Sequence, residues 1–173
     1  MTARISARIA VLPATSGAGE DRVRIASNAV VVLDGASGTD LGVSVSDYVD
    51  SLADHLIAAL DSNPSASLAG AVTAAIDHTT TACGLTPGHA PSSTVSIVRR
   101  GAETVDVLVL GDSPVYVSHL DRVDRVTDNR LKRLDLPSRP HGRKPLRDSP
   151  LAAATTTPTR ATSGCSPARK LPT

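Results

Sequence analysis

A run of apolar residues that ends in an aspartate and a glycine lies in the first quarter of the chain, where residues 29–38 read AVVVLDGASG. The five apolar residues favour a β-strand, and their unbroken order predicts a strand that is covered on both faces. An ionised carboxylate beside such a strand is costly unless it is paired or bound to a cation. Asp34 therefore marks the end of the strand and the first candidate for a functional site.

Short strands are also predicted before this run. Residues 4–12 have an apolar rhythm that suits a strand. Residues 23–26 are separated from residues 29–33 by Ser27-Asn28, a pair that suits a tight turn. Residues 35–42 are expected to form a loop, because they are rich in glycine and serine.

Two helices are predicted after this loop. Apolar residues recur at helical spacing from residue 45 to residue 60, and Asn63-Pro64 ends the pattern. A second apolar stripe begins near Ser67 and reaches Cys83. Because the connection is short, we expect the two helices to pair antiparallel.

A meander of antiparallel strands is predicted after the helices. The apolar runs over residues 94–98, 105–110 and 115–117 are separated by short turns, and residues 123–126 suit one more short strand. Strands and helices together indicate an α/β (α+β) fold.

Charge is divided unevenly along the chain, although the formal net charge is only +1. Up to residue 136 there are 16 acidic and 11 basic residues, whereas residues 137–173 hold one acidic residue, seven basic residues and seven of the 12 prolines. The second segment lacks apolar periodicity, so we expect a folded domain over residues 1–136 and a disordered basic tail over residues 137–173. The tail is rich in arginine, proline, serine, threonine and alanine, which is also the composition that a GC-rich coding region gives when it is translated out of frame. We therefore hypothesise that the natural reading frame is lost between residues 137 and 143.

The composition excludes several classes of function. The small net charge argues against a strongly basic nucleic-acid binder, and the only aromatic residues that could stack on bases are Tyr48 and Tyr116. No stretch approaches the ~18 apolar residues of a membrane span, and the N-terminus does not resemble a signal peptide. We expect a cytoplasmic protein that binds neither nucleic acid nor a membrane.

Acidic residues at strand ends form the candidate site. Asp34 follows one apolar run, Asp112 follows another, and Glu20 and Asp21 precede the strand pair that leads to Asp34. Carboxylates that converge at strand ends make a hard-oxygen site, which suits Mg²⁺ or Mn²⁺ rather than zinc. A plainer interpretation stays open for each residue. Asp34 and Asp112 also suit turns, and Glu20 and Asp21 also suit a solvated surface.

Four motifs, in this order, resemble the amino-terminal half of the PPM/PP2C family of metal-dependent Ser/Thr protein phosphatases. They read EDR at residues 20–22, VVLDGASG at 31–38, SSTV at 92–95 and LGDS at 110–113. In the family two helices lie between the second and third motifs, and two are predicted here. The resemblance covers roughly residues 1–136. It implies an incomplete PP2C-like antiparallel β-sandwich flanked by helix pairs, with about one sheet and one helix layer present.

The resemblance also implies a role for each acidic residue. Asp34 matches the aspartate that bridges two metal ions, and Gly35 matches the residue whose backbone carbonyl binds one of them. Asp21, together with Glu20, matches the acidic pair that contacts the metals directly or through water. Asp112 matches the site of an additional, weaker metal. The implied reaction is hydrolysis of phosphoserine or phosphothreonine by water that two Mg²⁺ or Mn²⁺ ions activate.

Departures from the family pattern predict reduced activity. SSTV lacks the family's glycine, Pro114 stands where many members have arginine, and Arg8 is the position-compatible candidate for the family's phosphate-binding arginine. The later Asp-Gly and Asp-Asn motifs that complete the family's metal site have no counterpart after residue 136. Asp128-Asn129 comes too early and is interpreted as a turn.

We therefore expect a PPM-type phosphatase-like chain that is inactive or weakly active. The alternatives are a non-catalytic interaction or regulatory module and a non-functional truncated product. A phosphoprotein substrate is implied if the chain is active. An incomplete sandwich also leaves an apolar sheet face uncovered, so we expect self-association through that face.

Overall fold

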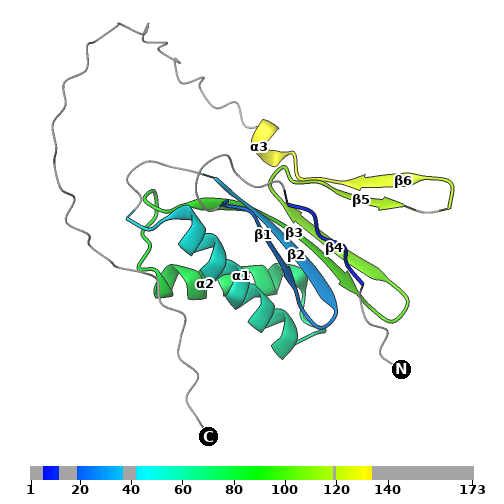
Figure 1. Cartoon of the computed structure of the whole chain (residues 1–173), viewed down its shortest axis with the longest axis horizontal. Helices are drawn as coiled ribbons and strands as arrows, with labels where there is room; N and C mark the ends of the chain where they lie inside the picture. The colour runs from blue at the N-terminus through cyan, green and yellow to red at the C-terminus, as the bar shows by residue number, and fades with distance from the viewer. Residues whose placement is uncertain (1–5, 12–18, 37–41, 119, 134–173) are drawn as a thin grey trace, which may run out of the picture.

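The structure, a computed structural model, describes residues 6–11, 19–36, 42–118 and 120–133 (Figure 1). The expected tail over residues 137–173, its hypothetical loss of frame and the end of the expected domain lie outside these residues. The elements are β1 (Arg22–Ile25), β2 (Ala29–Ala36), α1 (Val45–Ser62), α2 (Leu68–Ala82), β3 (Ser92–Arg100), β4 (Val105–Leu110), β5 (Val115–Ser118), β6 (Val123–Val126) and α3 (Arg130–Arg133).

A four-stranded antiparallel sheet with the order β1-β2-β3-β4 forms the centre of the fold. Strands β5 and β6 form a separate antiparallel hairpin that extends away from the sheet in Figure 1. The predicted α/β (α+β) class and the predicted meander are confirmed, with the difference that β5 leaves the sheet. The predicted strand over residues 4–12 is wrong within residues 6–11. These are exposed and have no strand structure, because no buried face is there to hold them.

Helices α1 and α2 pack side by side and cover one face of the sheet (Figure 1). Each begins at a serine that caps it: the side chains of Ser44 and Ser67 accept hydrogen bonds from the backbone N–H groups of Asp47 and Gly70. The buried core between the helices and the sheet is aliphatic. Its largest fully buried hydrophobic side chains are Val31, Leu33, Val49, Leu52, Leu56, Leu60, Val95 and Ile97.

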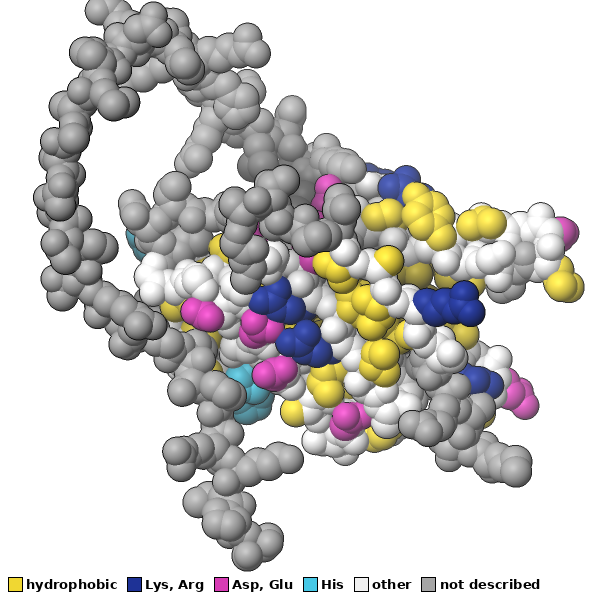
Figure 2. Space-filling model, viewed as in Figure 1, with side chains coloured by type: hydrophobic (Ala, Val, Ile, Leu, Met, Phe, Trp, Pro, Cys, Tyr) yellow, Lys and Arg dark blue, Asp and Glu magenta, His cyan; other side chains and the backbone are white. Residues whose placement is uncertain are grey.

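Strand β2 is covered on one face, not on both as its unbroken apolar run predicted. Val31 and Leu33 are fully buried toward the helices, whereas Val32 between them is 39% exposed. Paired residues share a face, so Val23 and Ile25 of β1 lie on the same uncovered face as Val32. Figure 2 shows apolar side chains gathered beside a cluster of basic and acidic side chains. The predicted self-association through this face stays a prediction.

A buried arginine joins the sheet to the connection between the two helices. Arg99 of β3 donates hydrogen bonds to the backbone carbonyls of Pro64 and Ala66, at 3.1 and 2.5 Å, and forms an ion pair with Asp106 of β4 at 2.8 Å. These partners compensate the burial of its charge. Among the described residues, no helix is long and apolar enough to cross a bilayer.

Candidate metal centre at the end of the sheet

The strand register places the acidic residues in one row across the end of the sheet. Leu33 pairs with Arg22, so the next residues, Asp34 and Asp21, face each other across β1 and β2. On its other side, Asp34 pairs with Thr94 of β3. Neighbouring strands lie about 4.8 Å apart, which makes these residues lateral neighbours.

Gly35 lets the segment that carries Glu20 approach β2 closely. A Cβ atom added to Gly35 would lie 2.9 Å from the backbone oxygen of Glu20 and 2.8 Å from Cγ1 of Val45. Only a glycine fits between these atoms without displacing them. The predicted loop over residues 35–42 is wrong at Gly35 and Ala36, which belong to β2, and its residues 37–41 lie outside the described residues.

Asp112 is brought to the same end of the sheet by the turn between β4 and β5. Gly111 takes a positive φ of 92°, and a Cβ there would lie 2.9 Å from Cγ2 of Thr94. The hydroxyl of Ser113 lies 2.7 Å from that of Thr94, and the carbonyl of Ser113 accepts from the hydroxyl of Ser96 at 2.7 Å. The turn is thus fastened to β3, with Asp112 exposed at its tip.

The electrostatics of Asp34 reflect these neighbours. Partial desolvation, the charge of Asp21 and a hydrogen bond with the Asp21 side chain raise the pKa of Asp34 above its ordinary value. The charges of Asp112 and Glu20 raise it further. Asp21, Asp112 and Glu20 therefore lie within electrostatic reach of Asp34, and their repulsion of its charge is what a bound cation would relieve.

The donors at this end suit a hard cation in type but do not form a closed ligand set. Carboxylate oxygens and a backbone carbonyl are the ligands that Mg²⁺ and Mn²⁺ prefer. In the part of the chain that the structure describes, no three histidine, cysteine, aspartate or glutamate side chains are arranged to hold an ion together. The residues fit a weak or open site better than a tight one.

Sequence reasoning missed the part played by Asp128, which was interpreted as a turn residue. Its carboxylate accepts from the backbone N–H of Arg130 at 3.0 Å and from the Arg130 guanidinium at 2.7 and 2.9 Å. The guanidinium and this N–H hold the pKa of Asp128 far below its usual range. The contact with the backbone N–H two residues on is an Asx turn, so what sequence reasoning missed is the ion pair with Arg130.

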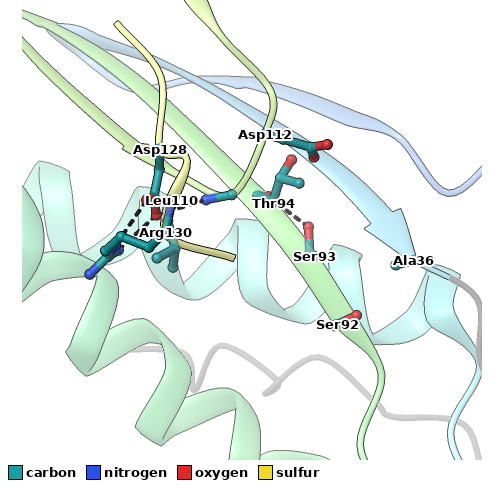
Figure 3. A pocket seen from close by; sticks show the side chains of 9 residues that line it. Ala36, Ser92, Ser93, Thr94, Leu110, Asp112, Asp128 and Arg130 are labelled. Atoms are coloured by element: carbon teal, nitrogen blue, oxygen red, sulfur yellow. Dashed lines mark hydrogen bonds and ion pairs between the residues drawn. The ribbon is translucent and has the colours of Figure 1, made fainter. Parts of the chain in front are cut away.

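A cavity of about 500 Å³ opens beside Asp112, between the sheet end and the start of α3 (Figure 3). Its walls include Ser92, Ser93 and Thr94 from β3, with Asp128 and Arg130 on the opposite side. This volume lies in the range of small-molecule sites. Arg8, the candidate phosphate-binding arginine, lies in the exposed segment before β1.

No protein-family model and no curated protein matches the chain. Solved structures with a similar fold include the PPM Ser-Thr phosphatase MsPP from Mycobacterium smegmatis in complex with cacodylate. It aligns with a TM-score of 0.55 and 19% identity over 67% of this chain and 49% of its own. The serine/threonine phosphatase PstP/Ppp of Mycobacterium tuberculosis aligns at a TM-score of 0.47 and 18% identity, over 67% of this chain and 50% of its own. The chain thus spans about half the length of these phosphatases, and its similarity to MsPP shows a PP2C-like fold.

Proposed function

We propose that the chain is a PPM-type phosphatase-like protein that binds Mg²⁺ or Mn²⁺ at the acidic end of its sheet and has weak or no hydrolytic activity toward phosphoserine and phosphothreonine. The observation that carries this proposal is the meeting of Asp21, Asp34 and Asp112 at one sheet end, in a fold similar to that of a PPM Ser-Thr phosphatase. Carboxylates that repel one another are stabilised in such a cluster when a cation neutralises them.

Each residue of the cluster has a distinct part in this proposal. Asp34 would be the central ligand, since it lies between Asp21 on one side and the Asp112 turn on the other. Gly35 would offer its backbone carbonyl, and Glu20 and Asp21 would contact the ions directly or through water. When bound, the cations would lower the pKa of a water molecule and stabilise charge on the phosphoryl oxygens.

The remaining residues of the site would bind and orient the substrate. The cavity beside Asp112 has room for a phosphorylated side chain, and the hydroxyl of Ser92 offers a hydrogen-bond donor within it, whereas the hydroxyl of Ser93 already donates to the carbonyl of Thr94. Arg130 places a cation at the cavity wall, although it is already paired with Asp128. A phosphoprotein substrate and a cytoplasmic location stay predictions.

A second candidate is a non-catalytic module that retains the fold and binds a partner. It is favoured by the lack, among the described residues, of three side chains arranged to hold one ion. Binding of a cation without turnover is the result that separates this candidate from a phosphatase.

The experiment compares hydrolysis of p-nitrophenyl phosphate and binding of Mn²⁺ in the parent chain, Asp34→Ala and Asp77→Ala. Asp77 is an exposed aspartate on α2, in the helix layer, and serves as the matched control. Hydrolysis that depends on Mn²⁺ and is lost only in Asp34→Ala supports a weak phosphatase. Binding lost in Asp34→Ala without any hydrolysis supports the non-catalytic module, and a parent chain that binds no Mn²⁺ contradicts the proposal.

A further inference from the structure

Arg22, the first residue of β1, uses all five N–H donors of its guanidinium. Its Nε and Nη2 donate to the two carboxylate oxygens of Asp50 on α1, at 2.7 and 2.8 Å, and Nη2 also donates to the hydroxyl of Ser46 at 2.5 Å. Its Nη1 donates to the backbone carbonyls of Gly19 and Asp21, at 2.5 and 2.9 Å. One side chain therefore joins α1 to the segment that carries the acidic pair.

The two backbone carbonyls lie on either side of Glu20. Because a single planar group holds both of them, the path of the chain through Glu20 is fixed relative to α1. The Arg22 side chain is only 16% exposed. Four of its five hydrogen bonds are partly buried, which makes their loss more costly, and the bond to the carbonyl of Asp21 is exposed.

The alternation of a strand separates Arg22 from the residue that it positions. Arg22 pairs with Leu33 and points toward the helices, so the side chain of the preceding Asp21 points to the other face, beside Asp34. Arg22 thus holds the segment from behind the sheet, while the Asp21 carboxylate lies at the front beside Asp34.

We propose that Arg22, anchored by Asp50, is a positioning residue that holds the segment before β1 so that Asp21 lies opposite Asp34 for cation binding. This inference rests on the proposed function, because it assigns the geometry of the same cation site. Lysine cannot replace the guanidinium here: it keeps the charge but cannot hold a carboxylate, a hydroxyl and two carbonyls with one nitrogen.

Arg24 provides a matched control on the same strand. Its Nη2 donates to Oδ1 of the same Asp50 at 2.7 Å, and its Nε lies 3.8 Å from Oδ1 of Asp54. Its backbone acceptor is the carbonyl of Val23, at 3.3 Å, and not the segment before β1. A change at Arg24 therefore disturbs the same ion pair without releasing the acidic segment.

The test measures the dissociation constant for Mn²⁺ from the electron paramagnetic resonance signal of free Mn²⁺, on the full chain and on Arg22→Lys, Arg24→Lys and Asp50→Asn. Loss of a residue that orients metal ligands weakens affinity by about tenfold to a hundredfold. We expect that loss in Arg22→Lys, and a change of less than about threefold in Arg24→Lys. Because Asp50 is expected to act only through Arg22, Arg22→Lys combined with Asp50→Asn should bind no more weakly than Arg22→Lys alone.

The outcomes distinguish failure of the positioning role of Arg22 from failure of the proposed function. If Arg22→Lys binds Mn²⁺ like the parent chain, or loses no more than Arg24→Lys, the positioning role is wrong while the proposed function stands. If the parent chain itself binds no Mn²⁺, the proposed function is contradicted and the inference with it. If circular dichroism shows that Arg22→Lys does not fold, Asp50→Asn decides: it should bind more weakly than Arg24→Lys, and equal affinity overturns the inference.

Discussion

The hydroxyl of Thr94 lies 2.7 Å from the hydroxyl of Ser113, and this contact ties the turn that carries Asp112 to strand β3. The carbonyl of Ser113 also accepts from the hydroxyl of Ser96, a side chain on the sheet face away from the helices whose residue is 5% exposed. We call these two contacts, among Thr94, Ser96 and Ser113, the clamp. The clamp is stable on an apolar sheet face because each of its polar groups has a hydrogen-bond partner. A buried hydroxyl that loses its partner keeps the full cost of desolvation.

The first prediction concerns this clamp. Ser96→Ala removes the donor to the Ser113 carbonyl, and Ser113→Ala removes the partner of the Thr94 hydroxyl, so each should lower the free energy of unfolding by about 1 kcal/mol. Urea denaturation measures the change. Ser92→Ala, at the exposed start of the same strand, should stay within about 0.5 kcal/mol of the parent chain. If Ser96→Ala and Ser113→Ala lower the free energy of unfolding no more than Ser92→Ala does, the clamp does not stabilise the fold.

The second prediction concerns the contact between β2 and the acidic segment. In Gly35→Ala the new methyl group would approach the Glu20 oxygen to 2.9 Å and Val45 to 2.8 Å, so the segment must move. We expect a loss of about 1 to 3 kcal/mol in the free energy of unfolding, the range for an added methylene in a packed place. Gly19→Ala is the control, because a Cβ at Gly19 meets no atom within 4 Å. A Gly35→Ala variant as stable as Gly19→Ala would contradict the close approach.

Local patterns were sufficient for most of the described elements. Helical spacing of apolar residues predicted α1 and α2, since the buried stripe of a helix repeats along the sequence. The alternative turn interpretations of Asp34 and Asp112 were also settled in part. Asp34 lies within β2 rather than in a turn, whereas Asp112 does lie in one.

Contacts between distant residues were beyond the reach of local patterns. Arg22 binds Asp50, 28 residues away, and nothing in the run EDRVRI distinguishes it from Arg24. Likewise the unbroken valines of β2 predicted burial on both faces, although Val32, on the face away from the helices, is 39% exposed. Periodicity reports how a segment is built, but which neighbour covers it depends on the tertiary fold.

The third prediction compares the stability that side chains on the two faces of β2 contribute, using the adjacent residues Val31 and Val32. Val31 is fully buried and Val32 is 39% exposed. Val31→Ala should cost about 2 kcal/mol, because it removes two buried methyl groups and leaves a cavity, whereas Val32→Ala should cost less than about 1 kcal/mol. Urea denaturation of both variants gives the comparison. A larger loss at Val32 would mean that another layer covers the open face in solution.

The fourth prediction follows from the raised pKa of Asp34. A carboxyl group whose pKa is higher in the folded state than in the unfolded state holds its proton more readily when folded, so its contribution to stability falls as pH rises through that pKa. At neutral pH the charged Asp34 faces Asp21, Asp112 and Glu20. Asp34→Asn should therefore raise the free energy of unfolding at pH 7 by about 0.5 kcal/mol, the modest size of partly exposed charge interactions.

The stability advantage of Asp34→Asn should be lost at low pH, and it should be reversed when Mn²⁺ is bound. Near pH 3, below the ordinary aspartate pKa of about 3.9, Asp34 is protonated in both states and the advantage of asparagine should vanish. Mn²⁺ at pH 7 should stabilise the parent chain by about 2.7 kcal/mol at one hundred times its dissociation constant, and stabilise Asp34→Asn much less. Thermal unfolding of the parent chain and of Asp34→Asn at both pH values, with and without Mn²⁺, measures the stability difference between them under each condition. In the free protein the Asp34 carboxylate repels its neighbours, and in the proposed site it binds the ion, so one substitution should stabilise the free protein and weaken its stabilisation by Mn²⁺. If Mn²⁺ stabilises Asp34→Asn as much as it stabilises the parent chain, Asp34 is not a ligand of the cation.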